Sequence, residues 1–561
     1  MKKRPMINLT ALILSLVLVL GACTSPAAVS SAPTDTTAAS ATVAPSGTPA
    51  AQEESNLNET GFPIVKKPIT LNVMACAYGN VTLAYNDMTY FKELEQLTNV
   101  HIEWNAIKSG DEFGQKKNLM YASGVYPDMI LKGTNNANDE EKYGVEQKIL
   151  IPLDSYMEKY MPNYTKILSG RPDFKKIMTA TDGHVYGIGV AMEMGYESPG
   201  HFFINKKWLD KLNLGVPKSL DELESVLEAF KSSDPNGNGE SDEIPYSTVL
   251  FDSVAGINNF ISLYGIADPN SGNNTTTHLN IIDGKIVFTA DKPQFKDAIV
   301  ELNKLYSQGL IDQEFITQDG TNLTSKIQSG NVGFFAYWRL TQSGFYEGIE
   351  NDYVCVEPFA VKDGVKPVWL RQLDGLTTGQ VVLTKENKYV EASLRWIDAQ
   401  MDFDMGMKSK YGVEYTKKND QGKYEQYLFK ADGTAASNDD VGQVCPGPGG
   451  IYFFTSDMLK ANYVFPKHHA EKYPYQDLYR PYLQSDYFNV LNYLRLSTED
   501  RDLVSRIGTD IESMVKENVI NMITKGNVDA TWDQYIENLK SLELDKYVQV
   551  FQAALDRYNS N

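Results

Sequence analysis

The first 23 residues carry the pattern of an export signal, so the remainder of the chain is expected to fold after leaving the cytoplasm. Lys2, Lys3 and Arg4 form a basic start, and an uncharged, mostly apolar run follows over residues 6–20. This run is shorter than the roughly 20 apolar residues that a spanning helix needs. Residues 1–22 are therefore assigned to a signal peptide.

The signal ends in the sequence Leu-Gly-Ala-Cys, with the cysteine at position 23. These four residues resemble a bacterial lipobox, in which small side chains admit the lipoprotein signal peptidase and a diacylglycerol is attached to the cysteine thiol. Cys23 would then be the first mature residue, lipid-anchored at the outer face of the cell membrane. The alternatives are an ordinary cleaved signal with a chance cysteine and an uncleaved anchor helix.

The segment that follows Cys23 is dominated by Ser, Thr, Ala and Pro and has hardly an aromatic residue. Such a composition cannot bury enough apolar surface to offset the entropy of ordering the chain. Residues 23–60 are therefore expected to be a lipid-anchored disordered linker.

Composition describes the remainder of the chain as a large globular body. The 561 residues are 42% hydrophobic and 11% aromatic, as in water-soluble globular proteins. The roughly 500 residues beyond the linker exceed the size at which one core keeps growing, so at least two lobes are expected. The formal net charge of −20 argues against nucleic acid and anionic headgroups as partners, because both need basic surfaces.

Cysteine is sparse. Apart from Cys23, the chain has Cys76, Cys355 and Cys445 and contains no C-x-x-C pair. A disulfide framework is therefore not expected to hold the fold. Buried free thiols are favoured, and a single bridge between Cys355 and Cys445 is the alternative.

Strand and helix patterns alternate along the body. Residues 70–76 and 101–107 have strand patterns and enclose helical spacing over residues 87–98. This order predicts a largely parallel sheet covered by helices, an α/β fold. Farther along, residues 202–204 form a short apolar strand, and Ser219 opens a capping box before a helical apolar stripe.

The C-terminal part is expected to be helical. Ser497 is the predicted cap of a long amphipathic helix that Gly526 ends. Two further helices are predicted over residues 531–542 and 545–558.

One loop has the spacing of a calcium site. Residues 234–243 spell Asp-Pro-Asn-Gly-Asn-Gly-Glu-Ser-Asp-Glu, close to the start of an EF-hand loop, with oxygen donors at positions one, three and five and glycine at position six. Position twelve is Pro245 in place of a bidentate glutamate, so the last two acids would have to close the shell. A turn without metal is the alternative. The predicted structural Ca²⁺ ligands are Asp234, Asn236, Asn238, Glu240, Asp242 and Glu243.

The order of several segments resembles a known family. The segments are 123–129 (Ser-Gly-Val-Tyr-Pro-Asp-Met), 151–154, 182–188, 203–209 and 216–223. Together they are similar to the extracellular solute-binding proteins of ABC importers, in the carbohydrate-binding group that includes maltose- and alginate-binding proteins. The alginate-binding branch carries a calcium loop like residues 234–243. The resemblance covers most of the mature chain.

The resemblance implies a two-lobed periplasmic-binding-protein-like fold with an inter-lobe cleft and a hinge. Chain crossings would fall near residues 191–200, 351–357 and 403–410. Lobe I would comprise residues 61–192 plus 356–404, and lobe II residues 201–352 plus 410–561. The ligand would close the lobes for recognition by the importer's membrane subunits.

Candidate ligand-binding residues come from segments that the family places at the cleft. A sugar site needs aromatic platforms surrounded by carboxylate, amide or guanidinium groups. A strand ends in Trp338 and Arg339, and a second group follows the expected second crossing. The full candidate set is Trp338, Arg339, Trp369, Arg371, Asp374, Glu193 and Tyr78.

The preferred function is capture of a solute, an oligosaccharide in the first place, by a monomeric binding lipoprotein that is not an enzyme. No hydrolase, metalloprotease, phosphate-loop or dinucleotide motif is present in the sequence. A secreted glycan-active enzyme, an adhesin, and a binding lipoprotein that serves a membrane sensor are the alternatives.

Overall fold

The computed structural model describes residues 55–560, except for 78–80, 82, 109, 132–136, 271–276, 341–350, 427–437, 467–469 and 471. The predicted signal peptide, Cys23, most of the predicted linker and Tyr78 lie outside the described residues. Among the residues described, no helix has the length and apolar character needed to cross a membrane.

The first lobe is built on a six-stranded sheet with the order β15-β4-β12-β3-β1-β2. Strand β1 (Ile69–Cys76) pairs in parallel with β2 (Val100–Ile107) and with β3 (Met129–Leu131). Helix α1 (Thr89–Thr98) connects β1 to β2, which confirms the predicted strand-helix-strand unit.

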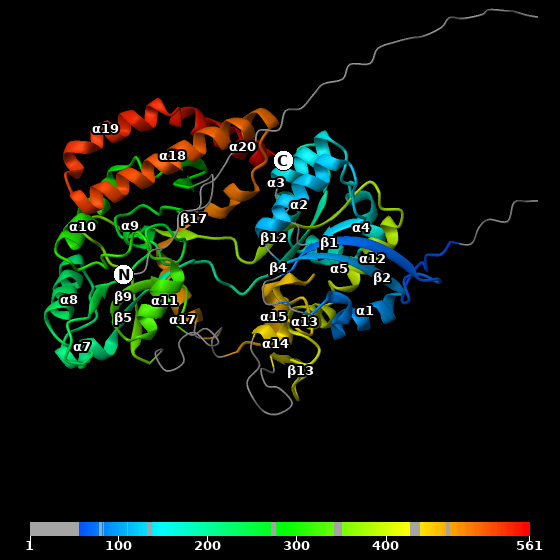
Figure 1. Cartoon of the computed structure of the whole chain (residues 1–561), viewed down its shortest axis with the longest axis horizontal. Helices are drawn as coiled ribbons and strands as arrows, with labels where there is room; N and C mark the ends of the chain where they lie inside the picture. Colours follow the sequence, from blue (N-terminus) through cyan, green and yellow to red (C-terminus); the bar gives the residue numbers. More distant parts are fainter. Residues whose placement is uncertain are drawn as a thin grey trace, which may run out of the picture. The chain divides into compact units, whose positions relative to one another are not determined.

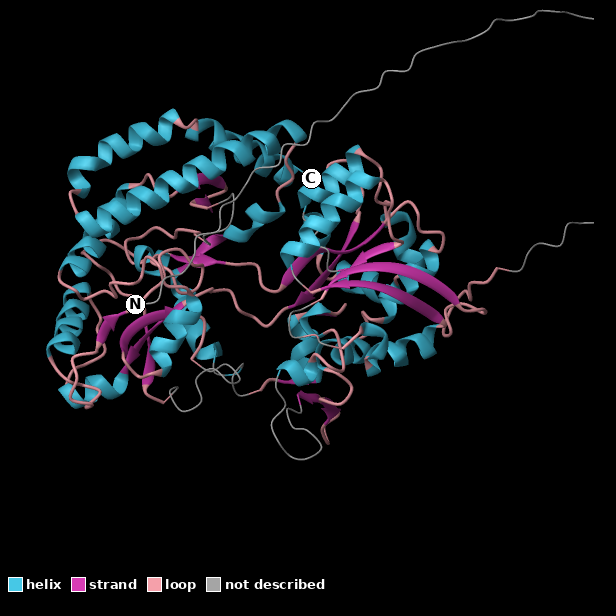
Figure 2. Cartoon of the chain, viewed as in Figure 1, coloured by secondary structure: helices cyan, strands magenta, loops and turns pink. Residues whose placement is uncertain are grey.

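Helices cover both faces of this sheet (Figure 2). Neighbouring residues of β1 point to opposite sides, since Val73 and Met74 belong to different hydrophobic clusters. Strand β12 (Leu376–Leu383) is antiparallel to β4 (Gly187–Met192), and β15 (Phe453–Phe454) pairs in parallel with β4. The sheet is therefore mixed, and two distant stretches of chain build it.

The second lobe is built on a four-stranded sheet with the order β10-β5-β9-β6. Its strands are β5 (His201–Asn205), β6 (Ile244–Tyr246), β9 (Val332–Tyr337) and β10 (Tyr353–Val356). The covering helices include α7 (Lys206–Leu212), α8 (Leu220–Ser232) and α10 (Pro293–Ser307).

The predicted start of α8 is confirmed. The Ser219 side chain accepts a hydrogen bond from the backbone of Glu222 at 3.2 Å, which satisfies one free N–H of the first turn. The apolar stripe of α8 is buried in the core of the second lobe.

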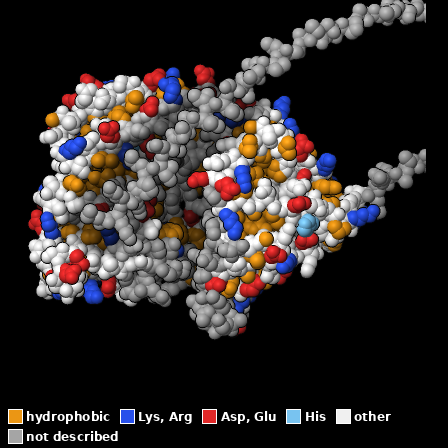
Figure 3. All heavy atoms as spheres, viewed as in Figure 1, with side chains coloured by type: hydrophobic (Ala, Val, Ile, Leu, Met, Phe, Trp, Pro, Cys, Tyr) orange, Lys and Arg blue, Asp and Glu red, His pale blue; other side chains and the backbone are white. Residues whose placement is uncertain are grey.

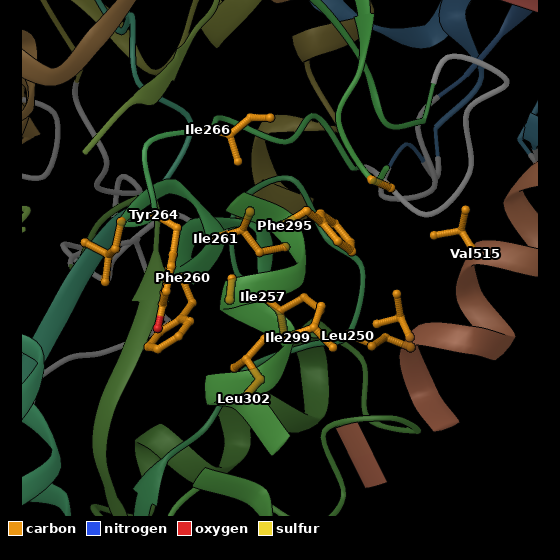
Figure 4. Packing of buried hydrophobic residues seen from close by; sticks show 14 of the residues in the cluster. Leu250, Ile257, Phe260, Ile261, Tyr264, Ile266, Phe295, Ile299, Leu302 and Val515 are labelled. Atoms are coloured by element: carbon orange, nitrogen blue, oxygen red, sulfur yellow. The ribbon is translucent and has the colours of Figure 1, made fainter. Parts of the chain in front are cut away.

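Three C-terminal helices, α18 (Thr498–Lys525), α19 (Val528–Ser541) and α20 (Leu544–Ser560), match the predicted number and positions. Ser497 caps α18 through the backbone N–H of Asp500, and Gly526 ends it with a φ of 76°. Helix α18 packs along α10 (Figure 1). Val515 of α18 belongs to the same cluster as Phe295 and Ile299 of α10 (Figure 4).

The structure also contains the following α-helices and strands. They are α2 (Gly110–Ser123), α3 (Ala137–Glu140), α4 (Asp154–Tyr160), α5 (Pro162–Ser169), α6 (Pro172–Met178), α9 (Asn258–Ser262), α11 (Gly320–Gln328), α12 (Val390–Ala399), α13 (Phe403–Tyr411), α14 (Asn438–Val441), α15 (Ser456–Asn462) and α17 (Lys472–Tyr479), with the minor strand groups β7 (Leu279–Ile282) with β8 (Lys285–Phe288), β11 (Trp369–Arg371) with β17 (Leu483–Tyr487), and β13 (Thr416–Lys418) with β14 (Tyr424–Gln426) and β16 (Tyr463–Val464).

The first crossing of the chain between the two sheets lies where the family resemblance implied. The second and third crossings lie elsewhere. Residues 193–200 connect β4 to β5, within the expected interval. The expected second crossing at 351–357 is wrong, because β10 stays in the four-stranded sheet and Val356 is buried in the second core. The chain returns to the six-stranded sheet at residues 372–375.

The third crossing also lies later than the expected residues 403–410. Helix α13 packs on β15, which belongs to the six-stranded sheet. Tyr479 at the end of α17 is buried in the second core. The crossing therefore falls between β16 and α17, because α13 and β15 still belong with the first sheet.

None of the three cysteines in the described part of the chain forms a disulfide. Cys445 is buried, and Cys76 and Cys355 are half-buried. This agrees with the expectation that disulfides do not hold the fold.

Candidate functional site

The first and second crossing segments lie side by side and are joined by hydrogen bonds. One carboxylate oxygen of Asp374 accepts from the backbone nitrogens of Gly195 at 2.5 Å and Tyr196 at 3.1 Å. The backbone nitrogen of Gln372 donates to the carbonyl of Glu197 at 2.9 Å. Asp374 therefore holds the first crossing segment in place.

Helix α17, which follows the third crossing, is tied to the first crossing segment by Gln476. The Gln476 side-chain oxygen accepts from the backbone nitrogens of Glu197 and Ser198 at 2.9 and 2.8 Å. Its amide nitrogen lies 3.1 Å from both the Ser198 carbonyl and the Nε2 atom of His201. All three crossings thus meet around residues 195–198.

His201, the first residue of β5, is neutral in this environment. Burial, and next the nearby Lys472 ammonium, lower the pKa of His201 to about 3. A neutral ring with its proton on Nδ1 donates to the Trp338 carbonyl at 3.3 Å and accepts at Nε2 from Gln476. This tautomer, inferred from the hydrogen-bond network, satisfies both neighbours.

A buried charged group lies next to this junction. Lys472, the first residue of α17, is 2% exposed, and its Nζ lies 4.1 Å from the ring centre of Tyr196 and 4.8 Å from that of Trp338. Burial, and next the Arg339 guanidinium, lower the pKa of Lys472 to about 7. Burial raises the pKa of Asp374 to about 6. Near neutral pH, the Lys472 amine is therefore about half protonated.

Trp338 lies at the end of β9 with two cationic side chains on its ring. It is half-buried, and the Arg339 guanidinium carbon lies 4.3 Å from its ring centre. Arg339 is itself 6% exposed. An aromatic face with cations, a carboxylate and amides around it has the chemistry that a saccharide site needs.

Trp338, Arg339 and Asp374, three of the predicted ligand residues, are thus brought together with Lys472 and Tyr196. These five residues are called the junction cluster below.

Glu193 lies on the first crossing segment but is engaged elsewhere. Its carboxylate forms an ion pair with Arg171 and accepts from the backbone nitrogen of Ser456 at 3.2 Å. Together with Phe403 these residues line a cavity of about 610 Å³ in the first lobe. Glu193 is therefore outside the junction cluster.

Trp369 and Arg371 of β11 do not join the cluster either. Trp369 is 1% exposed and packs edge-on against Phe202 and Tyr479 in the second core. This contradicts the expectation of a stacking platform, because both faces of its ring are inside the lobe. Arg371 binds Glu197 through Nε at 2.9 Å and Nη2 at 2.7 Å.

The predicted calcium loop folds so that its acidic and amide side chains converge. The Asp242 carboxylate accepts from the side-chain amides of Asn236 and Asn238 at 3.0 Å each, and from Asn331 at 2.8 Å. The Asp234 carboxylate accepts from the backbone nitrogens of residues 237–239 at 2.6 to 3.2 Å. The glycines of the loop supply the two positive φ angles that this turn requires.

Glu243 gives this loop an unusual charge environment. Both of its carboxylate oxygens are buried and have no hydrogen-bond partner among the described residues. Burial, and further the Asp242 and Asp234 carboxylates, raise the pKa of Glu243. A buried carboxylate without a partner beside two other acids suits a hard divalent cation. In the described part of the chain no three His, Cys, Asp or Glu side chains form a metal-binding group by themselves, so amide oxygens would have to complete the donor set.

Comparison with known proteins decides the family. Residues 84–400 match the family described as bacterial extracellular solute-binding protein. The chain belongs to this family. Its members bind a solute and do not transform it, so this is a binding protein and not an enzyme.

Three curated relatives resemble the chain. It is 30% identical over 528 residues to the fructooligosaccharide ABC transporter substrate-binding protein FusA of Streptococcus pneumoniae, covering 91% of this chain and 94% of the relative. It is 26% identical to lipoprotein LipO of Bacillus subtilis over 43% of this chain and 45% of the relative. It is 27% identical to the polygalacturonan/rhamnogalacturonan-binding protein YtcQ of Bacillus subtilis over 44% and 45%.

Solved structures agree with the family. FusA of S. pneumoniae in complex with kestose has a TM-score of 0.73 at 28% identity, covering 88% of this chain and all of that chain. A FusA EF-hand mutant in complex with fructo-nystose gives the same values. An alginate-binding protein solved without calcium ion, at 22% identity and a TM-score of 0.65 over 89% of this chain, shares the fold.

In this solute-binding protein, sequence reasoning missed Lys472, Tyr196 and Gln476. Their side chains contact residues that lie more than 130 positions away in the sequence, and no local pattern predicts such contacts. The density of aromatic residues over 472–479 was the one available signal.

Proposed function

We propose that the chain is the substrate-binding lipoprotein of an ABC importer and that its solute is a fructo-oligosaccharide. The observation that carries this proposal is the 30% identity to FusA across 91% of the chain. The similarity to FusA in complex with kestose extends over both lobes, since it covers 88% of the chain.

The junction cluster is the proposed place of solute contact. Trp338 supplies an aromatic face for a sugar ring, and Arg339, Lys472 and Asp374 supply polar groups for hydroxyls. Because the three crossing segments meet there, a solute held at the cluster would favour the closed arrangement of the lobes. The importer's membrane subunits would then receive the closed protein.

An acidic saccharide is the second candidate solute. The junction cluster holds two buried basic side chains, Arg339 and Lys472, and one carboxylate, Asp374, so a ligand that brings negative charge would favour the protonated form of Lys472. The relative YtcQ is a polygalacturonan/rhamnogalacturonan-binding protein. The neutral fructan is preferred because FusA matches over about twice the length.

Calorimetric titration separates the two candidates. Kestose is expected to bind the purified protein, and a digalacturonate is expected to bind at least about tenfold more weakly, a difference of about 1.4 kcal/mol. Tighter binding of digalacturonate would replace the first candidate by the second. Binding of neither, or release of monosaccharides from kestose, would contradict the proposal.

A structural calcium ion is part of the proposed function. Asp234, Asn236, Asn238, Asp242 and Glu243, with the main-chain carbonyl of Glu240, would hold it, and the ion would neutralise the acids that converge in the loop. The convergence of these side chains and the unpartnered Glu243 carboxylate support it. A FusA EF-hand mutant has been solved.

Lipid anchoring at Cys23 is the proposed localisation, outside the cell at its membrane. The lipobox-like sequence and the relative named lipoprotein LipO support it. Cys23→Ser is expected to abolish incorporation of labelled palmitate and to release the protein or leave its signal uncleaved. A processed Cys23→Ser protein that stays in the membrane would contradict the anchor.

A further inference from the structure

A small cavity lies between the first lobe and the C-terminal helix, apart from the junction cluster. Its volume is about 260 Å³. Helix α6 and the residues after it form one wall, and the end of α20 with residues 493 and 495 forms the other. The lining residues that matter here are Lys175, Lys176, Arg495, Arg557, Tyr493 and Tyr558.

The cavity is basic in an acidic protein. Four Lys and Arg residues line it, and no Asp or Glu is among its described lining, whereas the chain as a whole has a net charge of −20. On the face shown in Figure 3, acidic and basic side chains are interspersed. Charges of one sign in a concave site with apolar walls strengthen each other's field.

Three of these cations are not neutralised by the protein. Arg495 binds the Glu140 carboxylate at 2.7 Å and so is already compensated. Lys175, Lys176 and Arg557 form no ion pair with a described carboxylate. Asp173, the acid of α6, is engaged by Arg171 at 2.6 Å.

The walls between these cations are apolar. Pro172, Ile177, Ala180, Ala554 and the two tyrosine rings supply them. The Lys176 ammonium lies 4.6 Å from the ring centre of Tyr558, so a cation and an aromatic face are presented together. Pockets for drug-sized ligands have volumes of about 300–1,000 Å³, so this one suits a smaller molecule.

We propose that this cavity binds a small organic anion that combines one oxyanion head with an apolar body of about one ring. The head would lie among Lys175, Lys176 and Arg557, which line the cavity and could each donate a charge-assisted hydrogen bond to it. The body would lie against Tyr493 and Tyr558. The site is independent of the sugar, because none of its lining residues belongs to the junction cluster.

Occupancy would connect two separate cores. Ile177 of α6 packs in the core of the first lobe, and Ala554 of α20 packs in the core of the second. An anion held by both walls binds the folded protein only, so it raises the melting temperature by mass action.

Calorimetry and thermal shift on the full mature protein test the site with three probes. Benzoate has both the charge and the ring, benzamide has the ring without the charge, and acetate has the charge without the ring. Benzoate is expected to bind and to raise the melting temperature, with an affinity that falls as salt increases. Benzamide and acetate are expected to bind at least about tenfold more weakly.

A matched pair of variants locates the binding. Lys175→Gln/Lys176→Gln is expected to weaken benzoate by about tenfold and to leave kestose binding unchanged. Lys206→Gln/Lys207→Gln removes two adjacent lysines from α7 and is expected to leave both affinities unchanged. The proposal would be overturned if benzamide bound as tightly as benzoate, or if the control variant lost as much benzoate affinity as Lys175→Gln/Lys176→Gln. It would also be overturned if Lys175→Gln/Lys176→Gln bound benzoate with unchanged affinity. Retained kestose binding would show that this variant is folded.

Discussion

The Asp374 carboxylate lies 2.5 Å from the backbone nitrogen of Gly195, so the second segment that crosses between the lobes is fixed to the first. The next residue, Gly375, has a φ of 72° and leaves no room for a Cβ against the Met192 carbonyl. Any change in the angle between the lobes must therefore move these two segments together.

Removal of this acceptor is expected to destabilise the protein. Asp374→Ala leaves the N–H groups of Gly195 and Tyr196 without their acceptor, at a cost of about 1–3 kcal/mol for each group that stays buried. Asp374→Asn keeps one acceptor oxygen and should lose less. Urea unfolding measures both variants, and equal losses would show that the charge, and not the hydrogen bonds, matters.

Lys472 is expected to make stability depend on pH. Its pKa falls from 10.5 to about 7 in the fold, so between these values the unfolded chain binds more protons. The free energy of unfolding should therefore rise with pH from 7 to 9, and the penalty of burying Lys472 is complete below pH 7. Lys472→Met should raise the melting temperature at pH 6 and flatten this slope.

The exposed Lys206 provides the control for that experiment. Its side chain is 46% exposed, so Lys206→Met should leave the slope in place. If the Lys472→Met variant keeps the wild-type dependence of unfolding free energy on pH, a group other than Lys472 causes that dependence.

Arg495 is expected to stabilise the fold only where the Glu140 carboxyl is ionised. Glu140 is fully buried, and burial raises its pKa to about 7 even though Arg495 lies beside it. Arg495→Met leaves this carboxylate uncompensated, which typically costs about 3–5 kcal/mol. The loss should grow as pH rises above about 7, because the wild type then ionises Glu140 beside Arg495, whereas the variant has to keep this buried carboxyl protonated while the unfolded chain ionises it.

The Arg495→Met/Glu140→Gln double variant should recover part of that stability. Melting temperatures of the two single variants and the double variant complete a double-mutant cycle. Additive losses would mean that the pair is not coupled.

The calcium site predicts a selective response to a chelator. EDTA should lower the melting temperature of the wild type, since metal binding is coupled to folding. It should have little effect on Asp234→Ala/Asp242→Ala, which lacks two acids of the loop. Glu240→Ala is the control, because position seven uses its main-chain carbonyl; it should respond like the wild type. Equal responses of all three proteins to EDTA would contradict the proposed calcium site.

Local signals predicted the elements of this fold, whereas the assembly of distant segments was beyond them. Ser219 and Ser497 cap their helices as expected, because a capping hydrogen bond joins residues that are only three positions apart in the sequence. Residues 353–356 fell in the expected second crossing, with residue 356 opening the second stretch of the first lobe, but this strand pairs with β5. Sequence pattern cannot distinguish which sheet edge a short strand will join.

The same limit applies to the site. Trp338 follows the end of a strand and Trp369 begins a strand, and each lies near a crossing. Their sequence contexts do not show which of the two faces the solute site. The fold turns one toward Lys472 and the other toward Tyr479. Lys472 itself was missed because its significance comes from burial by segments far away in the chain.

These two tryptophans allow the sharpest test of the solute site. Trp338 is half-buried and Trp369 is 1% exposed, so truncation should act on different quantities. Trp338→Ala should weaken kestose by about 1–3 kcal/mol, by analogy with aromatic stacking on flat ligands, which is about a tenfold to hundredfold loss of affinity. Trp369→Ala should instead lower the free energy of unfolding by about 3–5 kcal/mol through the cavity that it leaves. Calorimetric affinity and urea unfolding, measured on both variants, give four values. Unchanged affinity in Trp338→Ala would remove this residue from the solute site, because a sugar stacked on its ring could not lose that surface without weaker binding.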